Sequence, residues 1–408
     1  MNRFLSIGRV VLMLVVVCAF ASLADAKTWY VAKNGNNGWA GSSSKPFKTI
    51  QKGLDVAQPG DTVLVRNGTY YEEVKFKRSG RSGKFIRLKA VNRHGAKIRS
   101  NKTYSIYANS KDYIEINGFD IQNSFNQWYG GSGITVEDSH NVRIYHNKIK
   151  FCGGGGIELK FVDSVTVEHN RVSFTTKYNT YQTSGISVYQ PKRFNNNDWQ
   201  IVIRYNRVHD NSHTVKNPYT NTVSDGNGII IDNTKGDDQS ADFGVEGSGV
   251  SYNKWILVDS NMCWNNGGAG VTTYKATKVM IRNNSTRNNW QVNGTGAAEI
   301  VVGDSSKVRV INNAIYGKGN APTIKEYWSD DVQWSNNCVY GGGTAWNNAT
   351  LWNTVWKDPQ FKSATDLHIK SSSPCKRKGT TGWGTNAKDI DGQNRIQNGI
   401  DIGADEIN

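Results

Sequence analysis

The sequence has little proline, little methionine and fewer acidic than basic residues. Its 408 residues include 7 Pro, 4 Met and 5 Cys, and 34 Asp and Glu stand against 49 Lys and Arg. So few prolines exclude a proline-rich linker protein, and the 42 glycines follow no three-residue period, which excludes collagen. Hydrophobic residues make up only 37%, but 13 Trp and 18 Tyr exclude a disordered chain.

Long hydrophobic runs are absent after the N-terminus. Arg3 and Arg9 precede an apolar run over residues 10–20, and Ala24 and Ala26 follow it. This pattern predicts a cleavable signal peptide over residues 1–26, and therefore a secreted or periplasmic protein. No later stretch approaches the ~18 apolar residues of a membrane span, so we expect no membrane insertion.

The excess of basic residues gives a formal net charge of +15. Such a charge predicts a polyanionic partner, and an exported chain makes an acidic polysaccharide the natural one. Nucleic acid is also a polyanion that a positively charged protein could bind, but no nucleic-acid-binding motif appears, so we expect no nucleic acid to bind.

Cysteines are too few for a disulfide-built scaffold. Cys18 leaves with the predicted signal, and the four that remain permit two disulfides. Cys263 falls on an inward strand position and is predicted to be a core thiol. Cys338 and Cys375 are the remaining candidates for a pair.

A nine-residue pattern recurs along the chain. It reads polar–apolar–x–apolar–x–x–Asn–x–apolar, and its alternation has the period of a strand with one buried face. The asparagine column contains Asn147, Asn170, Asn206, Asn261, Asn284, Asn313 and Asn337. Several of its spacings lie between 23 and 29 residues, and the larger ones can hold inserted loops.

A second pattern, Gly–apolar–x–apolar–x, is interleaved with the first. It covers residues 133–137, 156–160, 185–189, 228–232 and 270–274, with 298–302 as a looser copy. Short strands with Asn and Gly at the corners predict an all-β fold, a parallel β-helix forming one domain over residues 27–408. Equivalent residues would stack about 4.8 Å apart, so the asparagines can form a buried ladder.

Both ends of the predicted solenoid have their own sequence character. Residues 45–60 carry apolar side chains at helical spacing and predict a short helix that caps the N-terminal end. After about residue 357 the repeat is lost, and we expect residues 357–408 to form an irregular cap around the far end.

Three segments resemble a known superfamily: Lys45-Pro-Phe-Lys-Thr-Ile-Gln, Pro59-Gly-Asp-Thr-Val-Leu-Val and Asp401-Ile-Gly-Ala-Asp-Glu406. They are similar to secreted right-handed parallel β-helix proteins of the pectate-lyase-like superfamily. This resemblance implies a right-handed coil, but the superfamily includes lyases, hydrolases, epimerases and adhesins, so it does not define a reaction.

The outward positions of the glycine repeat supply candidate site residues. Because side chains alternate along a strand, the x positions face outward, and the insertion after Tyr189 is expected to border this face. The candidates for substrate binding are Tyr189, Glu137, Glu299, Trp199 and His213. A column of acids, a lysine and tyrosines suits a groove for an extended glycan.

Four aspartates form the densest acidic cluster: Asp225, Asp232, Asp237 and Asp238. Crowded carboxylates need a cation or a shared proton, and Ca²⁺ prefers such oxygen ligands. The sequence therefore predicts a calcium site, although no EF-hand spacing is present.

The arrangement of acids on one coil and a lysine on the next resembles polysaccharide lyase family 9. In that family, aspartate-bound Ca²⁺ binds the uronate and a lysine is the base, which implies Lys275 for that role. Lys160 is the rival base because it projects from the strand, and Tyr274 or Tyr189 could protonate the leaving oxygen. β-Elimination of an acidic, uronate-containing polysaccharide is the predicted reaction.

Two alternatives stay open. A glycoside hydrolase could use Asp232 with Glu158 or Glu299 as paired carboxylates. A non-catalytic glycan-binding or adhesive solenoid could use the same tyrosine-rich face. The sequence lacks the Gly-His-Gly of polygalacturonases, the Trp-Ile-Asp-His of family 1 pectate lyases and the Asp-Pro-His of mannuronan epimerases. We expect a monomer.

Overall fold

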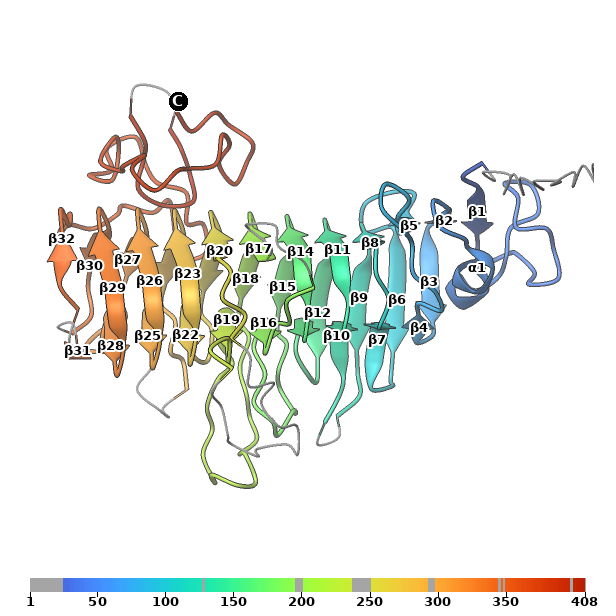
Figure 1. The fold of residues 1–408 in the computed structure, drawn as a ribbon, viewed down its shortest axis with the longest axis horizontal. Helices are drawn as coiled ribbons and strands as arrows, with labels where there is room; N and C mark the ends of the chain where they lie inside the picture. The colour runs from blue at the N-terminus through green and yellow to red at the C-terminus, as the bar shows by residue number, and fades with distance from the viewer. Residues whose placement is uncertain are drawn as a thin grey trace, which may run out of the picture.

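The computed structural model describes residues 25–126, 129–194, 201–236, 251–292, 298–343, 346–347, 349–396 and 399–407. Its strands form three long, wholly parallel sheets that wind around a common core (Figure 1). Each coil contributes one strand to each sheet in turn, so the chain is a right-handed parallel β-helix, as predicted. Among the described residues, no helix is long and apolar enough to cross a membrane.

Sheet A has twelve strands: β1 (Thr28–Val31), β2 (Thr62–Val65), β5 (Ile86–Ala90), β8 (Ile114–Asn117), β11 (His140–Tyr145), β14 (Asp163–Glu168), β17 (Ile201–Arg204), β20 (Ile256–Asp259), β23 (Thr277–Arg282), β26 (Ser306–Ile311), β29 (Asp330–Ser335) and β32 (Leu351–Trp352). Sheet B has ten: β3 (Gly68–Tyr71), β6 (Ala96–Ser100), β9 (Asp120–Asn123), β12 (Lys148–Cys152), β15 (Arg171–Ser173), β18 (Arg207–His209), β21 (Met262–Trp264), β24 (Ser285–Arg287), β27 (Ala314–Tyr316) and β30 (Cys338–Tyr340). Sheet C has ten: β4 (Val74–Lys75), β7 (Tyr104–Asn109), β10 (Ser132–Glu137), β13 (Ile157–Lys160), β16 (Ile186–Tyr189), β19 (Ile229–Asp232), β22 (Val271–Tyr274), β25 (Ile300–Gly303), β28 (Ile324–Tyr327) and β31 (Trp346–Asn347).

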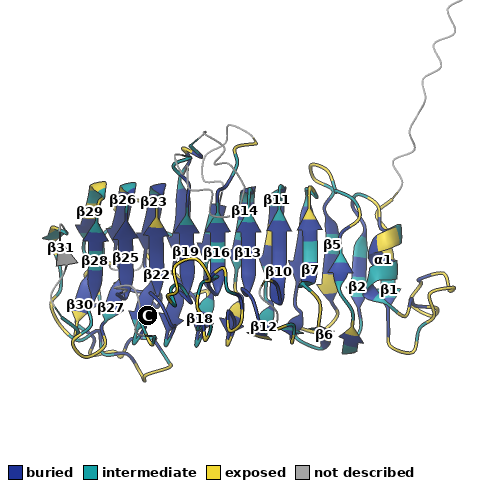
Figure 2. Cartoon of the chain, turned by 90° about the horizontal axis from the view of Figure 1, so that it is seen from below, coloured by how far each residue is buried: buried dark blue, intermediate teal, exposed yellow. Residues whose placement is uncertain are grey.

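The core is filled by the apolar positions of both repeats. In the glycine repeat, Ile134 and Val136 stack on Ile157 and Leu159 of the next coil, and all four are fully buried. Figure 2 shows the strands buried along most of the coil. Cys263 stacks on Val208 in this core, which confirms its predicted inward position. Cys152, Cys263, Cys338 and Cys375 are all buried free thiols.

The asparagine column forms the predicted ladder at the corner between sheets A and B. Asn170 donates from its backbone N and its Nδ2 to Oδ1 of Asn206, at 2.9 and 3.1 Å. Asn206 repeats both bonds to Asn261, and its Nδ2 also donates to the carbonyls of Val167 and Arg204. The same pairing continues from Asn147 to Asn337, so every buried amide in this corner has a partner.

The N-terminal cap is the helix α1 (Ile50–Val56), shorter than the predicted 45–60. Thr49 caps it by accepting a hydrogen bond from the backbone N of Lys52. Glu72 accepts bonds from the backbone N of Ile50 and Gln51, which satisfies two more donors of the first turn. The helix buries Ile50 and Leu54 against the first coil.

The C-terminal segment differs from its prediction, because it does not wrap the far end. It folds back along the side of the solenoid (Figure 1), where its apolar residues pack on outward side chains of sheet B. This cluster joins Met262, Trp264, Ala314 and Cys338 of the sheet with Phe361, Leu367, Ile369, Cys375, Ile390 and Ile402 of the segment. The segment packs here because the outward side chains of this part of sheet B are apolar, and burying them away from water is favourable.

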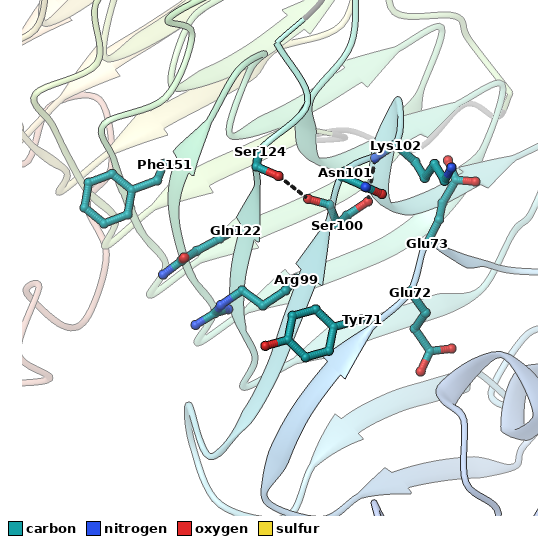
Figure 3. A pocket seen from close by; sticks show the side chains of 10 residues that line it. All are labelled: Tyr71, Glu72, Glu73, Arg99, Ser100, Asn101, Lys102, Gln122, Ser124 and Phe151. Atoms are coloured by element: carbon teal, nitrogen blue, oxygen red, sulfur yellow. Dashed lines mark hydrogen bonds between the residues drawn. The ribbon is translucent and has the colours of Figure 1, made fainter.

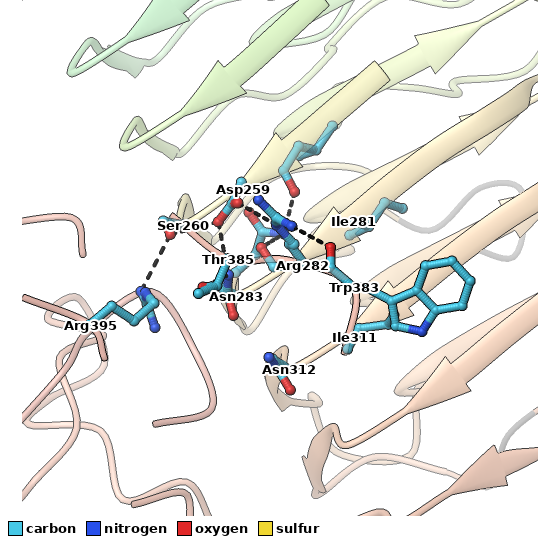
Figure 4. A network of polar contacts seen from close by, with 12 residues as sticks. Asp259, Ser260, Ile281, Arg282, Asn283, Ile311, Asn312, Trp383, Thr385 and Arg395 are labelled. Atoms are coloured by element: carbon cyan, nitrogen blue, oxygen red, sulfur yellow. Dashed lines mark hydrogen bonds and ion pairs between the residues drawn. The ribbon is translucent and has the colours of Figure 1, made fainter. Parts of the chain in front are cut away.

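Polar contacts fix the same segment at the turns that follow sheet A (Figure 4). Arg282 donates from Nε to Asp259 Oδ2 at 2.6 Å and from Nη1 to the carbonyl of Trp383 at 2.8 Å. The fully buried Arg395 donates from Nη2 to Ser260 Oγ at 3.3 Å. The bonds from Arg282 to Trp383 and from Arg395 to Ser260 therefore hold the segment against these turns.

We expect Asn206→Ala to lower the free energy of unfolding by about 2–4 kcal/mol, because several buried groups would lose their partners. Asn92→Ala, at an exposed asparagine with one weak side-chain bond, should change it little. Urea denaturation of the two variants and the parent measures the difference. Equal stability of the two variants would show that the ladder does not stabilise the fold.

Candidate active site

A groove lies on the outer face of sheet C, over β10, β13, β16 and β19. Its volume is about 820 Å³, and the long connections before β10, β16 and β19 border it. In Figure 1 these connections extend below the strands of sheet C. The charged and aromatic lining residues are Tyr104, Tyr129, Glu137, Glu158, Lys160, Phe161, Tyr181, Tyr189, Tyr219, Asp225 and Asp232.

The strand register brings the outward residues of successive coils into one column. Glu137 pairs with Lys160, Lys160 with Tyr189, and Tyr189 with Asp232. A parallel column runs beside it, in which Glu158 pairs with Ser187. Because neighbouring strands lie about 4.8 Å apart, the groove offers a new set of polar groups at each coil.

Among the described residues that line this groove, Lys160 is the only lysine or arginine. Its Nζ lies 3.4 Å from Glu137 Oε1 and 3.6 Å from Glu158 Oε2. Burial acts to lower the pKa of Lys160, but Glu158 and Glu137 outweigh it, and the pKa is raised above its ordinary value. The ammonium group is therefore protonated at neutral pH.

Both carboxylates beside Lys160 are held in place by further donors. Glu158 is 3% exposed, and its Oε1 accepts hydrogen bonds from Ser132 Oγ at 2.9 Å and from the backbone N of Gly155 at 3.0 Å. Glu137 Oε2 accepts a bond from the Tyr107 hydroxyl at 2.6 Å. The ring of Tyr107 stacks on Tyr104, with centroids 4.2 Å apart. This network fixes the rotamers at one end of the groove.

Asp225 stands apart from this network, at the other side of the groove. Burial raises its pKa to about 7, and only a hydrogen bond from Asn227 opposes that effect. Asp225 therefore exchanges its proton near neutral pH, whereas an ordinary aspartate would be ionised. Asp232 lines the same groove, so two of the four predicted calcium ligands share one cavity.

Two predicted substrate-binding residues do not lie in the groove. Glu299 aligns with Gly270, the glycine position of the repeat, where a side chain points into the interior toward Asn289, and it is 2% exposed. His213 is 3% exposed, and its Nε2 donates to the carbonyl of Thr183 at 2.6 Å. Burial lowers the pKa of His213 to about 4, so it supports a bordering loop as a neutral side chain.

Tyr274 pairs with Asp232 in the strand register and so continues the same column one coil beyond the groove lining, with Lys275 next to it in the chain. Lys275 follows the last residue of β22 at a left-handed corner with φ 46°, and its Nζ lies 5.6 Å from the Tyr274 ring centroid. Neither side chain belongs to the groove lining. Three other predicted residues, Trp199, Asp237 and Asp238, lie outside the described residues.

A second amide ladder went unpredicted. Asn211 donates to Asn266, and Asn266 donates to Asn289, each from its backbone N and its Nδ2. Asn289 in turn donates to both oxygens of Glu299, at 2.9 and 2.6 Å. The signal was available, because Asn211, Asn266 and Asn289 each follow a member of the first ladder by five residues. Burial raises the pKa of Glu299 to about 7.

Tyr104, Tyr107, Tyr129 and Tyr181 were also missed. Tyr107 pairs with Thr135 in the strand register, but its coil lacks the glycine that identified the later copies. Tyr129 and Tyr181 come from connections, whose positions no repeat pattern predicts.

Within the described part of the chain, one group of three metal-ligating side chains lies close together: His368, Asp391 and Asp405, in the C-terminal segment. The Nδ1 atom of His368 is hydrogen-bonded to Asp366, and its Nε2 atom is hydrogen-bonded to Asp391. These two bonds, led by the one to Asp391, raise the pKa of His368 to about 9 although burial acts to lower it. In this structure the cluster is a set of charged hydrogen bonds that ties together two parts of the C-terminal segment.

These features define the protein as a parallel β-helix with a polar, tyrosine-lined groove on one sheet. The chain belongs to the Pel9A-like right-handed β-helix family, whose model matches residues 29–301. The fold is similar to that of pectate lyase Pel9A, at 15% identity over 95% of this chain and 98% of that one, with a TM-score of 0.53. XylC in complex with xylose gives a TM-score of 0.52 at 12% identity, over 92% of this chain and 98% of that one.

A relative in Bacillus subtilis (strain 168), the uncharacterized protein YwoF, is 34% identical over 100 residues. The match covers 23% of this chain and spans about a fifth (21%) of the length of that relative. The family therefore rests on the β-helix match, which covers most of the chain.

The raised pKa of Glu299 makes stability depend on pH. In the unfolded chain this carboxyl ionises near its ordinary value, but in the folded protein it keeps its proton to about pH 7. The folded state thus binds more protons between those values, so stability falls as pH rises through that window. We expect Glu299→Gln, which has no charge, to remove this fall in stability with pH.

Urea denaturation of Glu299→Gln and the parent from acid to neutral pH measures the effect. Glu168→Gln is a control, because Glu168 is a partly exposed carboxylate paired with Arg204. If the parent and Glu299→Gln lose stability in parallel as pH rises, the ladder carboxyl is not protonated in the folded state.

Proposed function

We propose that the protein is an exported polysaccharide lyase that cleaves an acidic, uronate-containing polymer by β-elimination in the groove on sheet C. The observation that carries this proposal is the placement of Lys160, Asp225, Asp232 and several tyrosines in a single open groove of a Pel9A-like β-helix. A groove that crosses successive coils suits an extended chain, and tyrosines suit the faces of sugar rings.

Lys160 is assigned as the proton acceptor in preference to Lys275, because Lys160 lines the groove and Lys275 does not. β-Elimination removes the proton next to the uronate carboxylate, so the acceptor must first lose its own proton. Since Glu158 and Glu137 raise the pKa of Lys160, the reactive form appears only at alkaline pH. We assign protonation of the leaving oxygen to Tyr189, because it is the register neighbour of Lys160.

Asp225 and Asp232 are the residues that would hold a calcium ion. Their carboxylate oxygens are ligands that Ca²⁺ prefers, and Asp225 is partly buried, with no cation among the groups that shift its pKa. Bound calcium would neutralise the substrate carboxylate and so make the adjacent proton more acidic. Four carboxylates and a single lysine line the groove, so an acidic polymer needs such a cation to enter.

Asp225 also favours a second candidate, a glycoside hydrolase. A carboxyl that keeps its proton near pH 7 can act as general acid, with Asp232 or Glu158 as the second carboxylate. The hydrolase pair that includes Glu299 is excluded, because Glu299 is buried in the amide ladder.

The experiment that tests the proposal incubates purified protein with polygalacturonate, alginate and glucuronan, in calcium and in a chelator. We expect ultraviolet absorbance of an unsaturated uronate product from one polymer, lost with the chelator. Asp225→Asn and Asp232→Asn should raise the calcium concentration needed. New reducing ends without this absorbance would support the glycoside hydrolase instead. The absence of both signals on every polymer would overturn the proposal that the protein is an enzyme.

The role of Lys160 is tested by Lys160→Arg, which keeps the positive charge between Glu137 and Glu158 but cannot accept a proton. We expect the elimination rate to fall by about 100-fold or more, and the parent rate to rise with pH into the alkaline range. Lys275→Arg is the matched control and should stay close to the parent. If Lys160→Arg keeps full activity, Lys160 only pairs with the neighbouring carboxylates, and the role of base is assigned to Lys275.

A further inference from the structure

The outer face of sheet B changes character halfway along the coil. Its first outward column carries Lys97, Asp120, Lys148, Arg171 and Arg207 in the N-terminal half, and Met262, Ser285, Ala314 and Cys338 in the C-terminal half. The C-terminal segment packs on the second half, through the cluster with Met262, Ala314 and Cys338. It reaches the first half only at its border, where Arg207 pairs with Asp391.

The uncovered half, over β3, β6, β9, β12 and β15, is strongly basic. The cations at its outward positions are Lys97, Arg99, Lys148, Lys150 and Arg171. Asp120 is the one carboxylate among the outward positions of these five strands, and it is paired with Arg99 at 2.7 Å. This face therefore has an excess of positive charge, in contrast to the acidic groove on sheet C.

A groove with a volume of about 520 Å³ lies on the same face (Figure 3). Its floor is one register column, in which Tyr71 pairs with Arg99 and Arg99 with Gln122, and Phe151 stands at its far end. Tyr71 is 79% exposed and Phe151 55% exposed, so both rings can contact a ligand from solution. Phe174, itself exposed, stacks on Phe151 with centroids 5.3 Å apart.

The acidic residues at the edge of this groove are already engaged. Glu72 accepts hydrogen bonds from the first turn of α1, and Glu73 forms an ion pair with Lys75 at 2.8 Å. Lys150 lies over the ring of Phe151, with Nζ 5.4 Å from the centroid. The groups that face outward for a ligand are thus cations, amides and aromatic rings.

We propose that this half of sheet B binds an anionic polysaccharide without cleaving it, as a second glycan site distinct from the groove on sheet C. Lys148 and Arg171 stand on neighbouring coils ~4.8 Å apart, close to the length of one sugar in an extended chain, so they can meet successive carboxylates of a polymer. Exposed tyrosine and phenylalanine rings stack on sugar faces. The site would hold polymer near the molecule while the groove on sheet C acts, and it does not depend on which reaction occurs there.

The test compares two triple variants with the same change in net charge. Lys97→Glu/Lys148→Glu/Lys150→Glu reverses the proposed face, and the control Lys45→Glu/Lys48→Glu/Lys89→Glu alters exposed lysines elsewhere. Both are made in the Lys160→Arg background, so that neither cleavage nor its absence affects binding. Circular dichroism confirms that each variant folds, and affinity electrophoresis measures binding to polygalacturonate, dextran and single-stranded DNA.

We expect the face variant to bind polygalacturonate at least about tenfold more weakly than the control, because salt-sensitive charge contacts are lost. Tyr71→Ala/Phe151→Ala should weaken binding without changing its salt dependence, and dextran should bind to none of the proteins. Equal affinity of the face variant and the control would overturn the proposal. Equal binding of single-stranded DNA and polygalacturonate to the parent would overturn its assignment to a polysaccharide.

Discussion

The rest of the structure depends on the hydrogen bonds between stacked asparagines at the corner of sheets A and B. Each Oδ1 accepts the backbone N and the Nδ2 of the asparagine in the preceding coil, so both coils must keep the same register. A slip by one residue would leave these buried groups unpaired and would turn every outward side chain inward. The ladder thus holds the register across connections of very different length.

The active-site candidate is a consequence of that register. Asn170 and Asn206 lie 36 residues apart, and Asn206 and Asn261 lie 55 apart, yet both pairs make the same bonds. The extra residues form the connections that border the groove, while the strands keep Glu137, Lys160, Tyr189 and Asp232 in one column. Loops can therefore vary to shape a binding site without disturbing the floor on which the polar groups stand.

The groove on sheet C is acidic, whereas the exposed half of sheet B is basic. Four carboxylates line the groove on sheet C, and one lysine is held between two of them. The exposed half of sheet B carries the basic residues, and its other half is apolar where the C-terminal segment covers it. Net charge alone pointed to an acidic polymer, but it could not distinguish the faces, since it sums over the whole surface.

The sequence alone determined the coil, its inward residues and the first amide ladder, because each depends on a short repeat that can be read locally. It placed Glu158, Lys160, Tyr189 and Asp232 on one outward face for the same reason. Only the tertiary structure decided that Glu299 turns inward, that Lys275 stands outside the groove, and that the C-terminal segment covers a side of the solenoid. The raised pKa values of Asp225 and Lys160 were also beyond the sequence. Burial and neighbouring charges set them, and both come from residues distant in the chain.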